Sequence, residues 1–289
     1  MSFPESLAAV SRRLPDVRGK VTAAWKLHGW YMARGAPSES WRLDLRDGSR
    51  YVLPSAARMT WTAAYRGAYD AAAQRLVVPY IAPHTIVLDI GAALGLWTVP
   101  LGRAAVRVDA AVWAVEPYPP NLTWLERNVE LNGLDDVVHV VPTALGDEAG
   151  LVTMRAADHG GGSVGNAAVN VKPGGGLSVP VQRLDDIELP ERVSVIKVDV
   201  EGFELRVLRG AWETIRRDRP VIIGEFSAAW IDQRGDDLGG MLDDLRSEGY
   251  EVLTVAASRS RPWRARSRSE LAPVPAGAVG EDLLIRPLG

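Results

Sequence analysis

The chain has 289 residues, of which 47% are hydrophobic and 24% are charged, and its formal net charge at pH 7 is −3. These values are typical of a globular protein and exclude a mainly disordered chain, while the slightly acidic balance argues against nucleic acid as a partner. Because the sequence has no cysteine, disulfides, thiolate metal sites and a cysteine nucleophile are also excluded.

Neither a membrane span nor a secretory signal is expected. No apolar run approaches the roughly 18 residues that cross a bilayer, and the first residues contain Glu5 and no apolar core. We therefore expect a cytoplasmic protein.

Residues 1–80 are predicted to form an N-terminal extension of helices and a β-hairpin that packs on the rest of the chain. Apolar residues at helical spacing between positions 7 and 14 indicate a short amphipathic helix. In segment 41–54, polar and apolar residues alternate on both sides of an Asp-Gly pair, which is a strong hairpin signal. The alanine-rich segment 60–80 predicts one helix that ends near Pro79.

From residue 81 to residue 289, apolar strands alternate with helical segments, which predicts an α/β domain. The expected sheet is mostly parallel, has seven strands and carries helices on both faces. A β-hairpin insertion with a glycine-rich tip is predicted at about 148–193. The seven predicted strands are 85–91, 111–117, 137–145, 194–200, 220–226, 250–256 and 281–288.

The sharpest motif is the strand-to-helix turn Asp89-Ile-Gly91-Ala-Ala-Leu-Gly95. It has neither the G-x-G-x-x-G spacing of dinucleotide sites nor the ending of a P-loop, so a pyrophosphate ligand is disfavoured. Glu116 ends the next strand, 21 residues after Gly95, where an acid can accept the hydroxyls of a ribose. Together they indicate a nucleoside site without a phosphate grip, as S-adenosylmethionine requires, although a tight turn without a ligand is the alternative.

Two further motifs follow later strands. Leu145-Gly146-Asp147 falls where an adenine would lie, or is a surface turn. In Lys197-Val-Asp199-Val-Glu201-Gly202, a period of two places the charged side chains on one side of a buried strand. Such charges either pair with each other to close the strand or act on the acceptor, for example as a general base. A divalent metal would need more oxygen ligands than Asp199, with Glu225 as the obvious candidate, and is not expected.

The sequence resembles the FkbM-type methyltransferases. The resemblance covers roughly residues 60–256 and is carried by VLDIGAALGLWT, VWAVEPYPPNLTWLERNVELNG, ALGD and, most specifically, IKVDVEGFELRVLRGA. It implies a Rossmann-like seven-stranded fold, S-adenosylmethionine as cofactor and, most often, O-methylation. This chain has Ala93 where the family usually has asparagine, so a side-chain hydrogen bond to the cofactor is lost.

The resemblance also implies which residues bind and react. The expected cofactor-binding residues are Asp89, Gly91, Ala93 and Gly95 at the methionine end, Glu116, Pro117 and Asn121 at the ribose, and Ala144 and Asp147 beside the adenine. The expected catalytic residues are Asp199 and Glu201, to which the residues themselves add His159 as a candidate base. The candidate substrate contacts are Ser163 in the insertion, together with Glu225 and Trp230 near the fifth strand.

The leading hypothesis is therefore an O-methyltransferase acting on a hydroxyl of a sugar or other small metabolite, in natural-product or glycan tailoring. A nicotinamide-dependent oxidoreductase and a non-catalytic cofactor-binding relative are the alternatives.

The roles of two segments are left open. The glycine-rich segment 158–176 is either a lid or a disordered loop, and the arginine-rich run 259–268 is either an anionic site or a solvated loop. Whether the protein forms a homodimer is also left open. Four tryptophans in the extension either line an acceptor pocket or pack the extension onto the core: Trp25, Trp30, Trp41 and Trp61.

Overall fold

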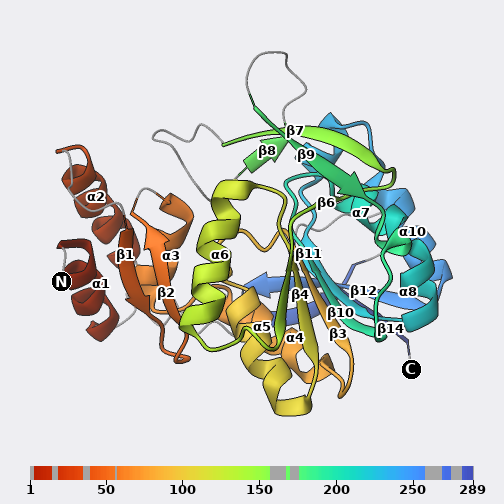
Figure 1. Cartoon of the computed structure of the whole chain (residues 1–289), viewed down its shortest axis with the longest axis horizontal. Coiled ribbons are helices and arrows are strands. Elements are labelled where there is room, and N and C mark those ends of the chain that lie inside the picture. Colours follow the sequence, from red (N-terminus) through yellow and green to blue (C-terminus); the bar gives the residue numbers. More distant parts are fainter. Residues whose placement is uncertain are drawn as a thin grey trace.

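The computed structural model describes residues 3–14, 19–34, 40–55, 57–156, 167–169, 176–257, 269–274 and 282–288. Figure 1 shows a central sheet with helices on both sides, a second sheet across its upper edge, and an N-terminal region at one side. This arrangement confirms the predicted α/β fold class. Among the described residues, no helix is both long and apolar enough to cross a membrane.

The N-terminal region consists of two helices, a hairpin and a third helix. In chain order these elements are α1 (Phe3–Arg13), α2 (Lys20–Met32), β1 (Ser40–Asp44), β2 (Arg50–Pro54) and α3 (Arg58–Arg66). The predicted hairpin is confirmed: β1 and β2 pair antiparallel, and Gly48 in the turn has a left-handed φ of 86°. Helix α2 has no counterpart in the prediction. Trp41 and Trp61 are buried in the hydrophobic core and pack around the buried ring of His28.

The single helix predicted for 60–80 is wrong. Helix α3 ends at Arg66 because Gly67 adopts φ 75°, the left-handed conformation that commonly terminates helices. After a short turn the chain forms α4 (Ala71–Val77) and a 3-10 turn, η1 (Val78–Tyr80). The turn contains Asp70, which is also left-handed, with φ 42°.

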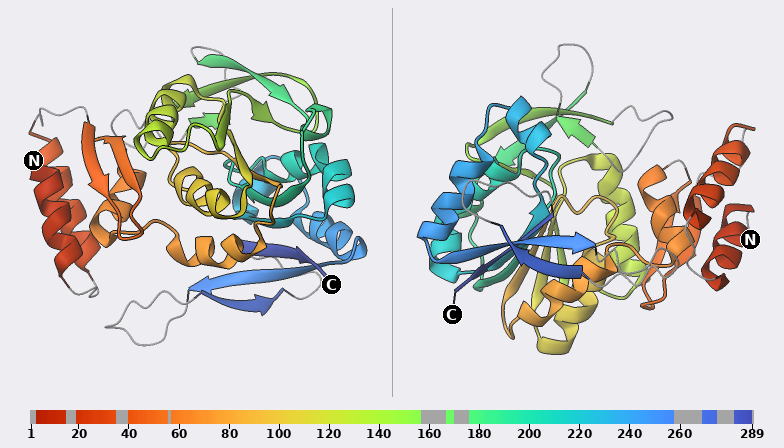
Figure 2. Two further views of the ribbon diagram at one scale, coloured as in Figure 1. Left: turned by 60° about the horizontal axis from the view of Figure 1, so that its bottom comes forward. Right: turned by 180° about the vertical axis from the view of Figure 1, so that it is seen from behind.

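The central sheet has eight strands among the described residues, one more than predicted. In spatial order they are β13 (Ser269–Pro273), β12 (Tyr250–Ala257), β14 (Asp282–Pro287), β11 (Val221–Glu225), β10 (Val193–Val198), β3 (Ile86–Ile90), β4 (Ala111–Val115) and β5 (Val138–Val141). The run from β11 to β5 is parallel, whereas β14 is antiparallel to both β11 and β12. The additional strand is β13, which pairs antiparallel with β12 at the edge of the sheet (Figure 2).

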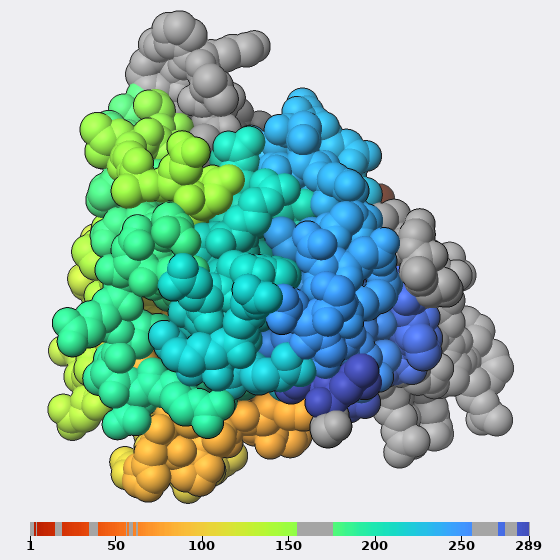
Figure 3. Space-filling model, turned by 90° about the vertical axis from the view of Figure 1, so that its right-hand side faces the viewer, coloured from red at the N-terminus to blue at the C-terminus, as the bar shows by residue number. Residues whose placement is uncertain are grey.

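Helices cover both faces of this sheet. Alternation along β3 sends Val87 to one hydrophobic cluster, with α5 and α6, and Leu88 to the other, with α7, α8 and α10. Figure 3 shows the second face, where these later segments form the outer surface in cyan and blue. The helices of the core are α5 (Thr98–Ala105), η2 (Val106–Val108), α6 (Pro119–Leu131), η3 (Leu184–Asp186), α7 (Glu204–Gly210), α8 (Trp212–Asp218), α9 (Ala228–Gln233) and α10 (Leu238–Ser247). The helix predicted for 205–218 is thus divided at Ala211.

The predicted hairpin insertion is present as an antiparallel pair of consecutive strands, within a larger sheet of four described strands. Their order is β6 (Ala144–Leu145), β9 (Leu177–Gln182), β7 (Gly150–Ala156) and β8 (Ala167–Val169). The predicted strand 137–145 is divided: β5 stays in the central sheet, while β6 leaves it and pairs parallel with β9. The second sheet therefore lies over the carboxyl edge of the central strands (Figure 1).

Candidate functional site

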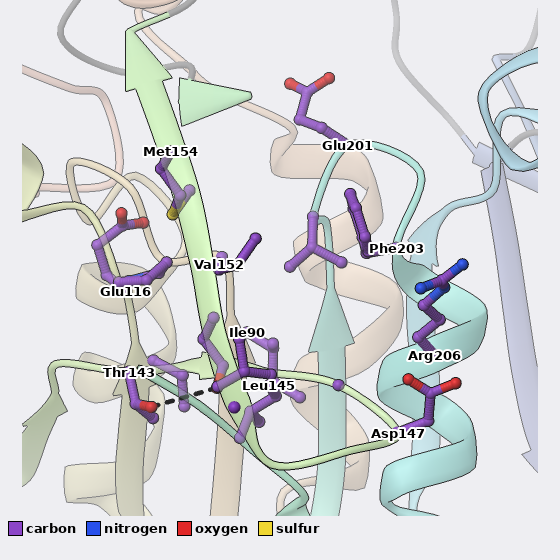
Figure 4. A pocket seen from close by; sticks show the side chains of 18 of the residues that line it. Ile90, Glu116, Thr143, Leu145, Asp147, Val152, Met154, Glu201, Phe203 and Arg206 are labelled. Atoms are coloured by element: carbon purple, nitrogen blue, oxygen red, sulfur yellow. Dashed lines mark hydrogen bonds between the residues drawn. The ribbon is translucent and has the colours of Figure 1, made fainter. Parts of the chain in front are cut away.

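A cavity of about 360 Å³ lies between the carboxyl ends of β3, β4 and β10 and the second sheet. Its volume is in the range of small-molecule sites. Figure 4 shows Glu116 on one side, Asp147 and Arg206 on the other, Ile90 and Leu145 between them, and Glu201 at the rim. Of the residues predicted to bind the cofactor, those in the cavity wall are Gly91, Ala93, Glu116, Pro117, Asn121, Ala144 and Asp147.

Gly91 forms the closest backbone contact at the cavity. Its φ is 78°, and a Cβ atom at this position would lie 1.9 Å from the carbonyl oxygen of Asp199. No side chain fits this approach, so glycine is required both by conformation and by space. Two residues later, Ala93 is also left-handed, with φ 49°, a conformation in which asparagine is favoured over alanine.

Asp89 and Gly95 lie behind this turn and do not belong to the cavity wall. Asp89 is fully buried, and its Oδ2 accepts a hydrogen bond from the Thr98 hydroxyl at 2.6 Å. Its Oδ1 lies 3.2 Å from the ammonium of Lys197. Gly95 has φ 85° and packs against Leu125. Both residues therefore shape the turn from inside.

Glu116 is buried and holds three N–H donors. Oε2 accepts from the Ala93 amide at 2.8 Å, while Oε1 accepts from the Tyr118 amide at 2.9 Å and from Asn121 Nδ2 at 3.2 Å. Since a carboxylate has about four acceptor positions, about one is left for a ligand. Burial raises the pKa of Glu116, and the three hydrogen bonds oppose that shift.

Asn121 supplies a second acceptor beside it. Its side chain is 1% exposed and lines the cavity, and no donor among the described residues reaches its Oδ1. A buried amide oxygen without a donor is costly unless a ligand or water supplies one. Glu116 thus has acceptor capacity left at the cavity wall, and the Asn121 side chain bonded to it carries a buried oxygen without a donor among the described residues.

The loop after β10 carries Asp199 and Glu201 into the cavity wall. The strand ends at Val198, so the predicted period of two does not extend to Glu201, which has φ 55° and is followed by Gly202 at φ 90°. The Glu204 carboxylate fixes this loop by accepting the amides of Val200 and Gly202, each at 3.0 Å.

The electrostatics of the loop favour proton transfer near neutral pH. Partial burial raises the pKa of Glu201 to about 7, and the negative charges of Asp199 and Glu225 add to this effect. A carboxylate with such a pKa is suited to accept a proton at physiological pH.

The other predicted site residues lie elsewhere. Glu225 ends β11 outside the cavity wall, and Trp230 on α9 is 43% exposed and backs onto Gly202. Among the described residues no group of three side chains is placed to hold a metal ion. His159, Ser163 and the arginine-rich run lie outside the described residues.

The sequence did not indicate the cavity wall at the start of α7, nor that Asp70 interacts with Asp199. Phe203 and Arg206, at the start of α7, line the wall, with Arg206 paired to Asp236 at 3.2 Å. Asp70 accepts a hydrogen bond from Trp97 Nε1 at 3.4 Å and experiences the charge of Asp199. The signal available for Asp70 was the break after Gly67, which the alanine-rich composition obscured.

A model of the FkbM methyltransferase domain matches residues 89–252. The chain belongs to the FkbM methyltransferase family. The matched segment runs from Asp89 through the Glu116 and Asp199 loops to β12, so it contains the described cavity. The resemblance inferred from the sequence is therefore confirmed.

The sequence identity to individual relatives is low. The methyltransferase sdnD of Sordaria araneosa is 27% identical over 168 residues, which cover 46% of this chain and 64% of that protein. This chain thus spans just under two thirds of the relative's length. The FkbM methyltransferase of Methylobacillus flagellatus is 18% identical, with a TM-score of 0.42, over 71% of this chain and 43% of that one.

A third similar protein is the Pyrococcus abyssi tRNA (uracil-54, C5)-methyltransferase, whose structure was solved in complex with S-adenosyl-L-homocysteine. It is 15% identical, with a TM-score of 0.40, over 86% of this chain and 44% of that one. At these TM-scores the solved structures add no argument on function, which rests on the family and on the cavity.

Proposed function

We propose that this protein transfers a methyl group from S-adenosylmethionine to a hydroxyl oxygen of a small-molecule acceptor. The observation that carries the proposal is the pair of acceptors, Glu116 and Asn121, in the wall of a cavity whose rim holds Asp199 and Glu201. The family supports methyl transfer as the reaction.

The cavity residues fit this cofactor. Glu116 Oε2 and Asn121 Oδ1 would accept the two ribose hydroxyls, and the Gly91 turn would admit the methionine part at close range. Apolar wall residues such as Val115 and Leu145 would contact the adenine. When bound, the sulfonium supplies an electrophilic methyl group, and the negative rim complements its positive charge.

The chain's own contribution to the reaction is orientation and proton removal. Glu201 is the proposed base, because its pKa of about 7 leaves much of it ionised at neutral pH. Asp199, held at the carboxyl end of β10, would orient the acceptor hydroxyl toward Glu201. The second sheet, through Val152 and Met154 of β7, covers the cavity and would exclude water.

We further infer the domain organisation that the sequence indicated, with residues 1–80 as an extension and 81–289 as the methyltransferase domain. Its support is the packing of β2 against α6, where the Asn128 side chain accepts the Val52 amide at 2.7 Å. Trp41 and Trp61 pack inside this extension and do not line the described cavity. The acceptor is thus proposed to be bounded by the rim residues rather than by these indoles.

Isothermal titration calorimetry with S-adenosylhomocysteine, followed by a release assay, tests the proposed function. We expect saturable binding of S-adenosylhomocysteine and none of NADH, because the turn lacks a pyrophosphate site. S-adenosylmethionine and a panel of sugars and phenols should then yield S-adenosylhomocysteine with at least one acceptor. Binding of NADH in preference to S-adenosylhomocysteine would overturn the proposal.

A further inference from the structure

Lys197 is a charged side chain inside the central sheet. It lies on β10 next to β3, and its side chain is only 5% exposed. An ammonium group in such a place is costly unless several partners surround it. Its partners therefore show what this residue does.

The ammonium group contacts both the core and the cavity wall. Toward the core it pairs with Asp89 Oδ1 at 3.2 Å. Toward the cavity it donates to the carbonyl of Gly91 at 2.8 Å and lies 3.7 Å from Asp199 Oδ2. Closing the strand alone does not require a buried ion pair, since apolar side chains of similar volume do this at least as well. Core packing therefore does not explain the two contacts of Lys197 on the cavity side, to the Gly91 carbonyl and to Asp199.

We propose that Lys197 is a positioning residue that holds the Gly91 turn and the Asp199 carboxylate in one fixed geometry, so that a ligand at the turn is coupled to the acceptor side. The backbone supports this link, because the Asp199 amide donates to the Ile90 carbonyl at 3.1 Å and the Asp199 carbonyl abuts Gly91. The role rests on the proposed function, in which the turn binds the cofactor.

Carboxylates from three elements keep the Lys197 side chain protonated. Burial by itself lowers the pKa of Lys197, but Asp89 on β3, Asp199 after β10 and Glu116 after β4 more than offset this, so the pKa is raised. The ammonium therefore remains a donor to the Gly91 carbonyl throughout the neutral range.

The first test uses the unaltered protein. The chain has four lysines, at positions 20, 26, 172 and 197, so ¹⁵N-lysine labelling gives a simple ammonium spectrum in which a buried, exchange-protected signal belongs to Lys197. We expect this signal to shift when S-adenosylhomocysteine is added to saturation. Binding that leaves the signal unmoved overturns the role of Lys197 alone. A protein that binds no S-adenosylhomocysteine overturns the proposed function, and this role with it.

The second test removes the buried Lys197–Asp89 pair as a unit, so that neither of these two charges is left buried alone, while the Asp199 carboxylate is 40% exposed. In the variant D89N/K197M we expect S-adenosylhomocysteine affinity to fall about tenfold, as for loss of one charge-assisted hydrogen bond. The matched control is R217M/D218N, which neutralises a bidentate pair at the other end of β10, where Asp218 accepts the Val193 amide. Its affinity should remain at the wild-type value.

A purely structural role is distinguished by combining D89N/K197M with D199N. If Lys197 acts through Asp199, the turnover losses of the two changes should not add, whereas independent effects add. Additive losses, or unchanged affinity in D89N/K197M, overturn the proposal. If D89N/K197M does not fold, the ammonium shift in the unaltered protein still decides it.

Discussion

On one side of the cavity Glu116 is buried and accepts three N–H groups, whereas on the other side Glu201 is partly exposed and occupies a left-handed backbone position. The first glutamate is held in place by local donors and is suited to bind. The second is partly buried and lies near the like charges of Asp199 and Glu225, which together raise its pKa to about 7 and suit it to proton transfer. The same type of side chain is thus proposed for two tasks, because its surroundings differ.

The contact between Gly91 and Asp199 joins the two sides, and breaking it should have the largest effect. Gly91→Ala forces a Cβ against the Asp199 carbonyl at 1.9 Å and strains a φ of 78°. We expect a loss of about 4 kcal/mol in the free energy of unfolding, measured with urea.

Gly133→Ala is the matched control for this change. Gly133 is also left-handed, with φ 63°, but nothing lies within 4 Å of its would-be Cβ. It should lose only about 1 kcal/mol. Equal losses in the two variants would show that the Asp199 contact adds nothing.

Glu201→Gln tests the reactive side. Because the amide cannot accept a proton, turnover at pH 7 should fall about 100-fold, while the affinity for S-adenosylhomocysteine should not change. Wild-type turnover should rise with pH through about 7, as the base ionises. A variant that keeps wild-type turnover and this pH profile would exclude Glu201 as the base.

The same variant has a signature in stability. The pKa of Glu201 is raised from 4.5 to about 7 on folding, so the folded state binds more protons between these values. The wild-type protein therefore loses stability as the pH rises through this window. Glu201→Gln should remove that loss, so its advantage over wild type appears at pH 8 and is absent at pH 4, as thermal unfolding would reveal.

Glu116→Gln tests the binding side. The amide nitrogen replaces an acceptor with a donor opposite N–H groups, so S-adenosylhomocysteine affinity should fall about 30-fold. Calorimetry measures the effect, with Glu130→Gln on the exposed face of α6 as control. If both variants bind alike, the ribose role of Glu116 is wrong.

Ala93→Asn should give the smallest effect and in the opposite direction. Asparagine tolerates the φ of 49° better than alanine does, so the free energy of unfolding should rise by about 0.5 kcal/mol. Since Ala93 lines the cavity, affinity for S-adenosylhomocysteine should also improve. A destabilised variant would show that Ala93 is favoured here for packing.

The sequence predicted those features that depend on local pattern. The apolar strands and the Gly91 turn follow from residues near one another, and so does the position of Glu116. By contrast, the left-handed conformation of Glu201 opposes the preference of its own side chain and is imposed by the Glu204 carboxylate. Local pattern did not indicate it.

Which strands pair with one another could also not be predicted from the local sequence pattern. Residues 137–145 are predicted as one strand, and only the pairing with β9 shows that β6 leaves the central sheet. Strand β13 follows an arginine-rich run and is recognised only through its pairing with β12. Asp70 lies in the turn that follows the end of α3 at Gly67, and its bond to Trp97 and its exposure to the charge of Asp199 are tertiary features.

The side chain of Asn128 ties the extension to the cavity. Its Oδ1 accepts the Val52 amide of the hairpin at 2.7 Å, and its Nδ2 donates at 2.9 Å to the carbonyl of Leu94, inside the glycine turn. One amide thus holds both an N-terminal strand and the turn that is proposed to contact the cofactor. The hairpin is therefore not an independent appendage: its removal would take the Val52 donor from the same side chain that holds the Leu94 carbonyl.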